Sequence, residues 1–183
     1  MKNLLAALLL LPGVCAAQAK TLCGVEAPLT VMQDGRRLEL NGLGVRTKIV
    51  FKVYVGALYL EKASADGAAI AASEQVKRME LAFLRGVSGA EVAKAIAEGF
   101  DRNSGDRAPA LRERVEQFRK LIPDVKKGDR LAFVYRPGQP LEVQANGKKT
   151  GEVPGKDFAD TLFLVWLGAR PADKDLKAGL LAR

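Results

Sequence analysis

The sequence contains no histidine and only two cysteines, Cys15 and Cys23. Without histidine, the chain lacks the general base of Ser-His-Asp and Cys-His sites and a common ligand of zinc and haem. The glycine-rich phosphate loops G-x-x-x-x-G-K-[ST] and G-x-G-x-x-G are also missing from it. These absences exclude most hydrolase, metalloenzyme and nucleotide-dependent functions, and we expect no cofactor and no metal.

The first residues have the pattern of a secretory signal peptide. The stretch MKNLLAALLLLPGVCAAQAK has a short basic start, an apolar run at residues 4–11, a Pro-Gly break and a small-residue ending. The apolar run is too short to span a bilayer. We therefore predict a signal peptide at residues 1–19, cleavage after Ala19, a periplasmic location and one domain at residues 20–183.

Cys15 raises the alternative of a lipid anchor, but the bulky Val14 before it fits lipoprotein processing poorly. We therefore expect no stable membrane anchor. Cleavage would remove Cys15 and leave Cys23 alone, so that no intramolecular disulfide could form. Stability must then come from the core, and the 48% content of hydrophobic residues is sufficient for one sizeable core.

Basic residues outnumber acidic ones, with 29 Lys and Arg against 21 Asp and Glu and a formal net charge of +8. The predicted signal carries only Lys2 as a charged residue, so the excess remains after cleavage. This charge favours encounter with acidic ligands or membrane surfaces. The bases are scattered and are not interleaved with aromatics, so we expect no nucleic-acid binding. A solvated basic surface is the simpler alternative.

Periodicity and turn residues predict strands, then helices, then strands, then helices. Strand patterns lie at residues 29–32, 37–40, 40–62, 78–84, 131–135, 141–144 and 148–153. Helical patterns lie at residues 65–75, 88–100, 111–122, 157–167 and 173–181, and the second begins with the capping box Ser88 and Glu91. The stretch 41–44 has only a turn-like composition. This order predicts an α+β fold, a largely antiparallel sheet with a layer of helices on one face.

The stretch LNGLGVRTKIVFKVYVGALYLEK, residues 40–62, joins a cationic segment to an apolar strand. Arg46, Lys48, Lys52 and Tyr54 stand at alternate positions, which would place them on one face of a strand. On a straight strand, Arg46 and Tyr54 would be about 26 Å apart at about 3.3 Å per residue. They can share a ligand group only if the chain bends or reverses between them.

Several stretches together resemble the bacterial exported branch of the chalcone isomerase-like family. They are LNGLGVRTK…FKVYVGALYLEK, FLRGVSGAEVAKAI, NGKKTGEV and FADTLFLVWLG…DKDLKAGLL. The resemblance spans about residues 22–182. It implies an open-faced sandwich in which a ligand lies between sheet and helices. The family includes plant chalcone isomerases, which are intramolecular lyases, and fatty-acid-binding proteins that use the same cleft without catalysis.

The resemblance carries over only part of the isomerases' catalytic set. The arginine of the isomerases falls on Arg46 and their threonine on Tyr54. Their tyrosine and asparagine fall on Val92 and Gly99. Near the end of the last long helix, where the isomerases have a polar residue, this chain has Val165 and Trp166. The isomerase adds a phenolate to an enone and needs hydroxyls to stabilise the enolate as charge develops. The apolar replacements therefore argue against isomerase activity.

An arginine in an apolar cleft can still hold a carboxylate by two charge-assisted hydrogen bonds. We predict a non-catalytic protein that binds a fatty acid or other small amphipathic acid through Arg46, Tyr54, Val92 and Trp166. One alternative is an intramolecular lyase that acts on an enone. Another is a ligand-free structural or interaction module, which would be favoured if the protein's own side chains fill the cleft. The sequence indicates no particular protein partner.

The cations also have a simpler interpretation. Arg46, Lys48 and Lys52 can form the solvated face of one strand, with the intervening apolar residues as core: Ile49, Phe51, Val53 and Val55. If Arg46 instead faces the cleft, we still expect Lys48 and Lys52 to reach solvent, because an ammonium is strongly hydrated and its stem is flexible.

The other site residues have alternatives as well. Val92, Ile96 and Phe100, at helical spacing, can belong to the core, and so can Trp166. Tyr135 could supply the hydroxyl from another strand in place of Tyr54.

Overall fold

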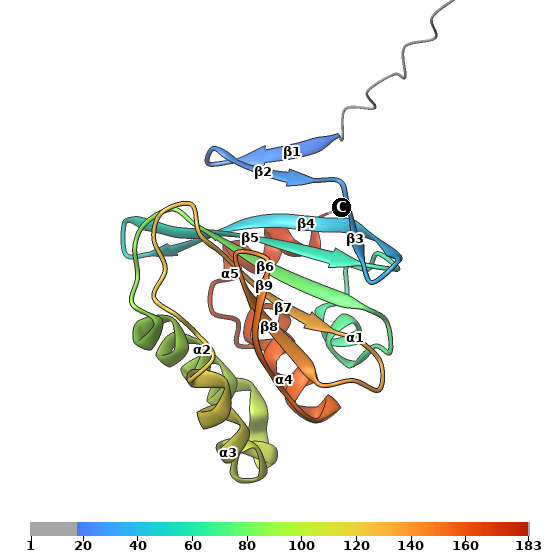
Figure 1. Ribbon diagram of the computed structural model, residues 1–183, viewed down its shortest axis with the longest axis vertical. Coiled ribbons are helices and arrows are strands. Elements are labelled where there is room, and N and C mark those ends of the chain that lie inside the picture. Colours follow the sequence, from blue (N-terminus) through green and yellow to red (C-terminus); the bar gives the residue numbers. More distant parts are fainter. Residues whose placement is uncertain (1–17, 183) are drawn as a thin grey trace, which may run out of the picture.

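The computed structural model describes residues 18–182, in which an antiparallel sheet is covered by helices on one face (Figure 1). The seven strands lie side by side in sequence order: β3 (Thr30–Gln33), β4 (Arg36–Lys48), β5 (Phe51–Leu60), β6 (Lys77–Phe83), β7 (Arg130–Tyr135), β8 (Leu141–Ala145) and β9 (Lys148–Val153). Neighbouring strands pair antiparallel throughout. The α+β open-faced sandwich expected from the sequence is therefore confirmed. The predicted signal peptide falls outside the described residues, apart from Gln18 and Ala19.

The helix layer consists of α1 (Gly67–Ala72), α2 (Gly89–Ser104), α3 (Ala108–Arg119), α4 (Lys156–Leu167) and α5 (Lys174–Leu181), with a short 3₁₀ turn between α2 and α3. α2 begins at the predicted capping box, in which Ser88 Oγ accepts from Glu91 N and Glu91 Oε2 accepts from Ser88 N. α1 is shorter than expected, because Asp66 caps its start and Ser73 ends it in an extended conformation. Within residues 18–182, no helix is long and apolar enough to cross a membrane.

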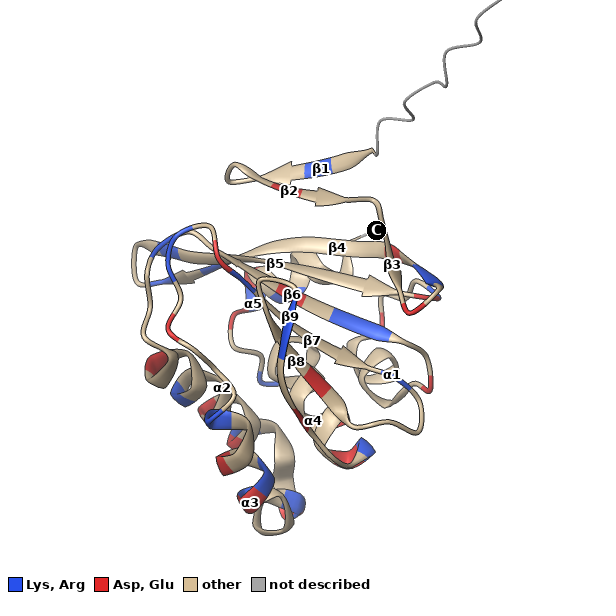
Figure 2. Ribbon diagram, in the orientation of Figure 1, with Lys and Arg blue, Asp and Glu red and all other residues tan. Residues whose placement is uncertain are grey.

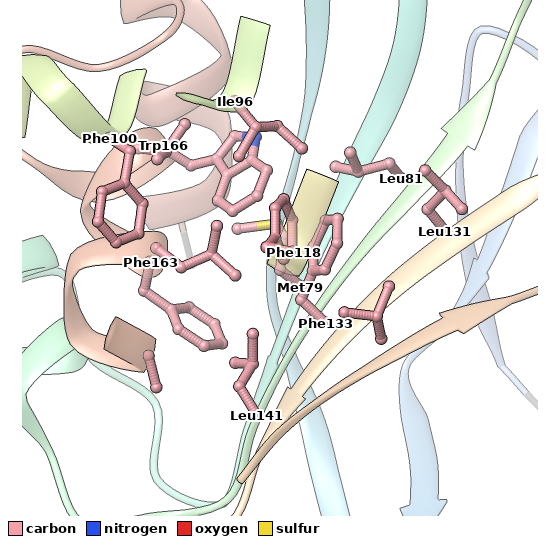
Figure 3. Packing of buried hydrophobic residues seen from close by; sticks show 14 of the residues in the cluster. Met79, Leu81, Ile96, Phe100, Phe118, Leu131, Phe133, Leu141, Phe163 and Trp166 are labelled. Atoms are coloured by element: carbon pink, nitrogen blue, oxygen red, sulfur yellow. The ribbon is translucent and has the colours of Figure 1, made fainter. Parts of the chain in front are cut away.

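The main core lies between the sheet and the helices (Figure 3). Alternate residues of the central strands, such as Met79 and Leu81 of β6, point toward α4 because side chains of a strand alternate between faces. Phe133 of β7 stacks on Trp166 of α4 with 5.4 Å between the ring centroids. These contacts bury one face of the sheet against the apolar side of α2 and α4.

The opposite face of the sheet carries a hairpin that the sequence reading missed. β1 (Ala19–Leu22) pairs antiparallel with β2 (Val25–Pro28) and lies over β4 and β5 (Figure 1). The hairpin helps to cover a small second cluster of buried hydrophobic residues, which includes Tyr59. Its turn contains Cys23, which is exposed and unpaired by any disulfide within the described chain. The strands are short and largely exposed, so their hydrophobic pattern was too weak to predict them.

Residues 40–62 do not form one long strand. They contain most of β4 and all of β5, and Lys48 pairs with Phe51, so that Ile49 and Val50 form a two-residue loop. Ile49 has a φ of 60°, a conformation that β-branched residues rarely adopt. The loop contains no Gly, Asn or Asp, which are the usual signals of such a turn, and this explains why the reversal was missed.

The stretch 41–44 is also not a turn, because it lies within β4 and forms the seat of α5. A Cβ at Gly42 would lie 2.3 Å from the Gly179 carbonyl oxygen, and one at Gly44 would lie 2.5 Å from that of Leu176. Asn41 stands at a register shift in β4, and its side chain donates to Leu180 O over 2.9 Å. Small residues on both elements therefore let the backbones of α5 and β4 approach closely.

We expect Gly44→Ala to lower the free energy of unfolding by about 1–3 kcal/mol, as overpacking of a well-packed site does. The added Cβ would press on the backbone of α5 and displace it. Gly86→Ala is the control, because a Cβ there lies at an ordinary 3.5 Å from the Val125 carbonyl oxygen. Chemical denaturation of both variants measures the effect, and equal midpoints would contradict the proposed close contact.

Candidate ligand-binding site

A cavity of about 320 Å³ lies between the β4–β5 hairpin, β6, α2 and α4. This volume is at the lower end of the about 300–1,000 Å³ that small-molecule sites occupy. Its buried walls are mostly apolar: Tyr54, Leu81, Phe83, Val92, Ile96, Val165 and Trp166. The lining residues at its mouth are exposed: Lys48, Ile49, Phe51, Arg85, Gly86, Glu91 and Ala95. The cavity is therefore apolar inside and opens to solvent beside the hairpin.

The structure brings the four residues named from the sequence together, since Arg46, Tyr54, Val92 and Trp166 all line this cavity. Arg46 and Tyr54 are direct partners in the β4–β5 register, and directly opposed residues in an antiparallel pair project to the same face. The reversal at residues 49–50 thus removes the separation expected for a straight strand.

Tyr54 is buried and its hydroxyl accepts a hydrogen bond from Trp166 Nε1 over 3.0 Å. In the described part of the chain, this is the hydrogen bond that the Tyr54 hydroxyl makes, so its O–H proton is free to donate to a ligand. Burial raises the pKa of Tyr54 to about 12, although the Trp166 N–H and the charge of Arg46 act in the opposite direction. Tyr54 is therefore a neutral donor at physiological pH.

Arg46 is partly buried, with 24% of its side chain exposed, and it is not unpaired. Its Nη1 donates to the Ala172 carbonyl oxygen and lies 3.5 Å from Asp173 Oδ2. Asp173 is itself occupied, because Oδ1 caps α5 at Leu176 N and Oδ2 accepts from Thr47 N. The Arg46–Asp173 contact is longer than a typical charge-assisted bond, so part of the guanidinium fork remains available to an anion.

The lysines of the hairpin differ from Arg46 as expected, since Lys48 and Lys52 are both exposed. The alternative with Ile49 and Phe51 in the core is wrong, because these residues are 88% and 58% exposed. These residues lie at the tip of the β4–β5 hairpin. A two-strand hairpin, rather than one amphipathic strand, explains the alternating cations.

Tyr135 does not supply the hydroxyl of this site. Its side chain is buried elsewhere and donates to Glu74 Oε2 over 2.8 Å. The two alternatives for Val92 and Trp166 prove compatible, because both residues are buried in the core and also form cavity wall.

The sequence reading missed two residues that shape the site. Asp173 meets Arg46 across 127 positions of sequence, and Ala172 lines the cavity. Asp173 was visible only as the start of the last helical pattern, and no local signal connected it to Arg46. Among residues 18–182, no group of His, Cys, Asp or Glu is arranged to hold a metal.

The geometry defines an open-faced sandwich with a mostly apolar cavity between sheet and helices, lined in part by the partly buried Arg46. The profile of the chalcone isomerase-like family matches residues 19–182. The chain belongs to the chalcone isomerase-like family. A comparison with curated protein sequences gives no significant match.

Among solved structures, this chain is similar to a fatty-acid binding protein of Arabidopsis thaliana. The TM-score is 0.70 with 14% sequence identity, and the alignment covers 90% of this chain and 96% of the plant chain. At this identity the similarity concerns the fold.

We expect all three tyrosines of the folded protein to ionise above their ordinary pKa of about 10. Burial raises the pKa of Tyr54 to about 12 and also raises the pKa values of Tyr59 and Tyr135. The folded state then keeps protons that the unfolded state releases above about pH 10, so stability should fall as pH rises through this range.

Tyrosinate absorbance measured against pH, in buffer and in denaturant, tests this prediction, with circular dichroism to verify folding at each pH. A tyrosine that ionises at its ordinary pKa while the protein is still folded would contradict it.

Proposed function

We propose that the cavity binds a fatty acid or similar small amphipathic carboxylate without chemical conversion. The observation that carries this proposal is the position of Arg46 directly opposite Tyr54 in the lining of a mostly apolar cavity. Two donors, one charged and one neutral, suit the two oxygens of a carboxylate. The fold similarity to a protein described as fatty-acid binding supports the same ligand class.

In the proposed complex, the carboxylate lies between the Arg46 guanidinium and the Tyr54 hydroxyl. The hydrocarbon chain contacts the methyl-rich wall formed by Val92, Ile96 and Val165, where burial of apolar surface stabilises binding. Asp173 opposes the ligand by charge, but both of its oxygens already accept backbone N–H groups. Its repulsion is therefore reduced and does not exclude an anion from the open side of Arg46.

Packing around α2 disfavours the lyase alternative. Gly99 occupies the position implied for the catalytic asparagine, and a Cβ there would lie 2.7 Å from Val165 Cγ1. A larger polar side chain would have to displace the Val165 side chain of α4. Val92, at the position implied for the catalytic tyrosine, presents only methyl groups to the cavity. Enolate stabilisation would then depend on Tyr54 and Arg46 alone.

The ligand-free module is also disfavoured, because the cleft is not filled by the protein's own side chains. We further propose that the protein acts in the periplasm after removal of residues 1–19. This part of the proposal rests on the signal-like sequence. Intact-mass measurement of secreted protein would verify a start at Lys20.

We expect Arg46→Ala to weaken binding of a long-chain carboxylate by about tenfold or more, because a charge-assisted hydrogen bond contributes about 1.5–3 kcal/mol. Arg46→Lys should recover only part of the affinity, since a point charge cannot form the planar fork. Trp166 is the only tryptophan and lines the cavity, so its fluorescence can report binding without a label.

Two further variants separate ligand contact from folding. Lys52→Ala should bind like wild type, because Lys52 is exposed and does not line the cavity. Val92→Phe should shorten the apolar space and weaken a long-chain acid more than a short-chain acid. Equal affinities of all variants for every chain length would overturn the proposed site.

We expect 2′-hydroxychalcone to cyclise no faster with the purified protein than without it. The reason is that the set of hydroxyls for enolate stabilisation is incomplete. Absorbance of the chalcone followed over time is the measurement. Turnover that disappears in Arg46→Ala would favour the intramolecular lyase instead.

A further inference from the structure

The tip of the β4–β5 hairpin exposes three consecutive large apolar side chains. Ile49, Val50 and Phe51 are 88%, 76% and 58% exposed. Among the described residues, the other large apolar side chain with comparable exposure is Met32, which lies in β3. An exposed apolar cluster of this kind usually marks an interaction site, because contact of apolar surface with water is unfavourable and binding removes it.

Basic side chains surround this tip. Lys48 and Lys52 flank it and are exposed, and the Arg85 guanidinium lies 5.4 Å from the Phe51 ring centroid. Lys126 and Lys127 lie on an adjacent loop, since Val87 and Val125 form a bridge between the two loops: residues 84–88 and 121–129. Figure 2 shows Lys and Arg gathered where this hairpin and these loops meet.

Three acidic groups lie nearby, and all three are engaged. Glu91 accepts from Ser88 in the capping box, and Asp124 accepts from Gly89 N over 2.8 Å. The carboxylates of Glu91 and Asp124 therefore satisfy the N-terminus of α2, and Asp129 accepts from Lys126 N over 2.7 Å. Five basic groups against these three acids leave the tip with a net positive charge. This apolar centre with a basic surround is complementary to an anionic bilayer, whose headgroups are negative and whose interior is apolar.

The tip is also continuous with the cavity. Lys48, Ile49 and Phe51 line its mouth, whereas Val50 and Lys52 do not contribute to the lining. A surface that docks through this tip would therefore face the opening of the cavity. A membrane-bound amphiphile could then enter without crossing water.

We propose that the β4–β5 hairpin tip docks reversibly on an anionic lipid surface, inserting Ile49, Val50 and Phe51 at the headgroup level. Lys48 and Lys52 contact lipid phosphates while their stems lie along the interface. The docking orients the cavity mouth toward the bilayer. This inference rests on the proposed function for its purpose, but the docking itself is measurable without any fatty acid.

The test is co-sedimentation of the full mature chain with phosphatidylcholine vesicles, with and without phosphatidylglycerol. Wild type should partition to the anionic vesicles and much less to the neutral ones. Val50→Asp and Lys52→Glu should each lower the partition coefficient by about fivefold or more, since they place a charge among apolar groups or reverse a basic one.

Matched controls lie at the other end of the sheet, where exposed Met32 pairs with exposed Arg37 in the β3–β4 register. Met32→Asp and Arg37→Glu introduce the same chemical changes away from the cavity. They should partition like wild type. An equal loss in control and tip variants would mean that overall charge, not the tip, drives binding, and would overturn the proposal.

Two other outcomes would also overturn it. Equal partitioning of wild type, Val50→Asp and Lys52→Glu would do so. Concentration-dependent dimerisation that Val50→Asp abolishes, without vesicle binding, would assign the tip to a second copy of the chain. Sedimentation equilibrium measures this dimerisation.

Tryptophan fluorescence titration without vesicles separates this proposal from the proposed function. Val50→Asp and Lys52→Glu should retain wild-type affinity for a free fatty acid. Loss of vesicle binding with intact affinity in these variants supports docking. If wild type binds vesicles but has no affinity for the fatty acid, the docking proposal is supported and the proposed ligand is contradicted.

Discussion

The close contact between β4 and α5 is the constraint on which the site depends. Gly42 and Gly44 allow the backbone of α5 to lie directly on the sheet, and Gly179 makes the same allowance from the helix. This contact places Asp173, at the start of α5, within reach of Arg46 and Thr47. The glycines therefore determine where the one partly buried arginine of the cavity finds its counter-charge.

The second constraint is the reversal at residues 49–50, which gives one segment two roles. Its inner part places Arg46 opposite Tyr54 inside the sandwich, and its outer part exposes Ile49 and Phe51 to solvent. The cations divide in the same way. An arginine can be partly desolvated when its fork is hydrogen-bonded, whereas lysines keep their hydration at the surface. The proposed ligand binding and the proposed surface docking therefore depend on different residues of one hairpin and can be tested separately by mutation.

Several elements were predictable because their signals are local. The capping box at Ser88, the strand patterns at residues 29–32 and 37–40 and the apolar pattern at residues 157–167 depend on neighbours in sequence. Accordingly, α2, the β3–β4 hairpin and α4 lie where these signals indicated. The Ile49-Val50 turn was not predictable, because it uses residues that disfavour such a turn, and the antiparallel pairing of β4 with β5 determines its position. The burial of Lys77 was not predictable either. It is fully buried, and its Nζ donates to three carbonyl oxygens at the end of α1.

The sequence by itself determined the fold class, because alternation and helix caps are written in consecutive residues. Its short motifs also carried the family resemblance, and that resemblance pointed to the four cavity residues. Only the tertiary structure decided that Arg46 meets Asp173, that Tyr54 accepts from Trp166, and that the hairpin tip is exposed. Each of these facts joins segments far apart in the chain or depends on a backbone reversal. Such contacts follow from the packing of the whole domain, which no local pattern contains.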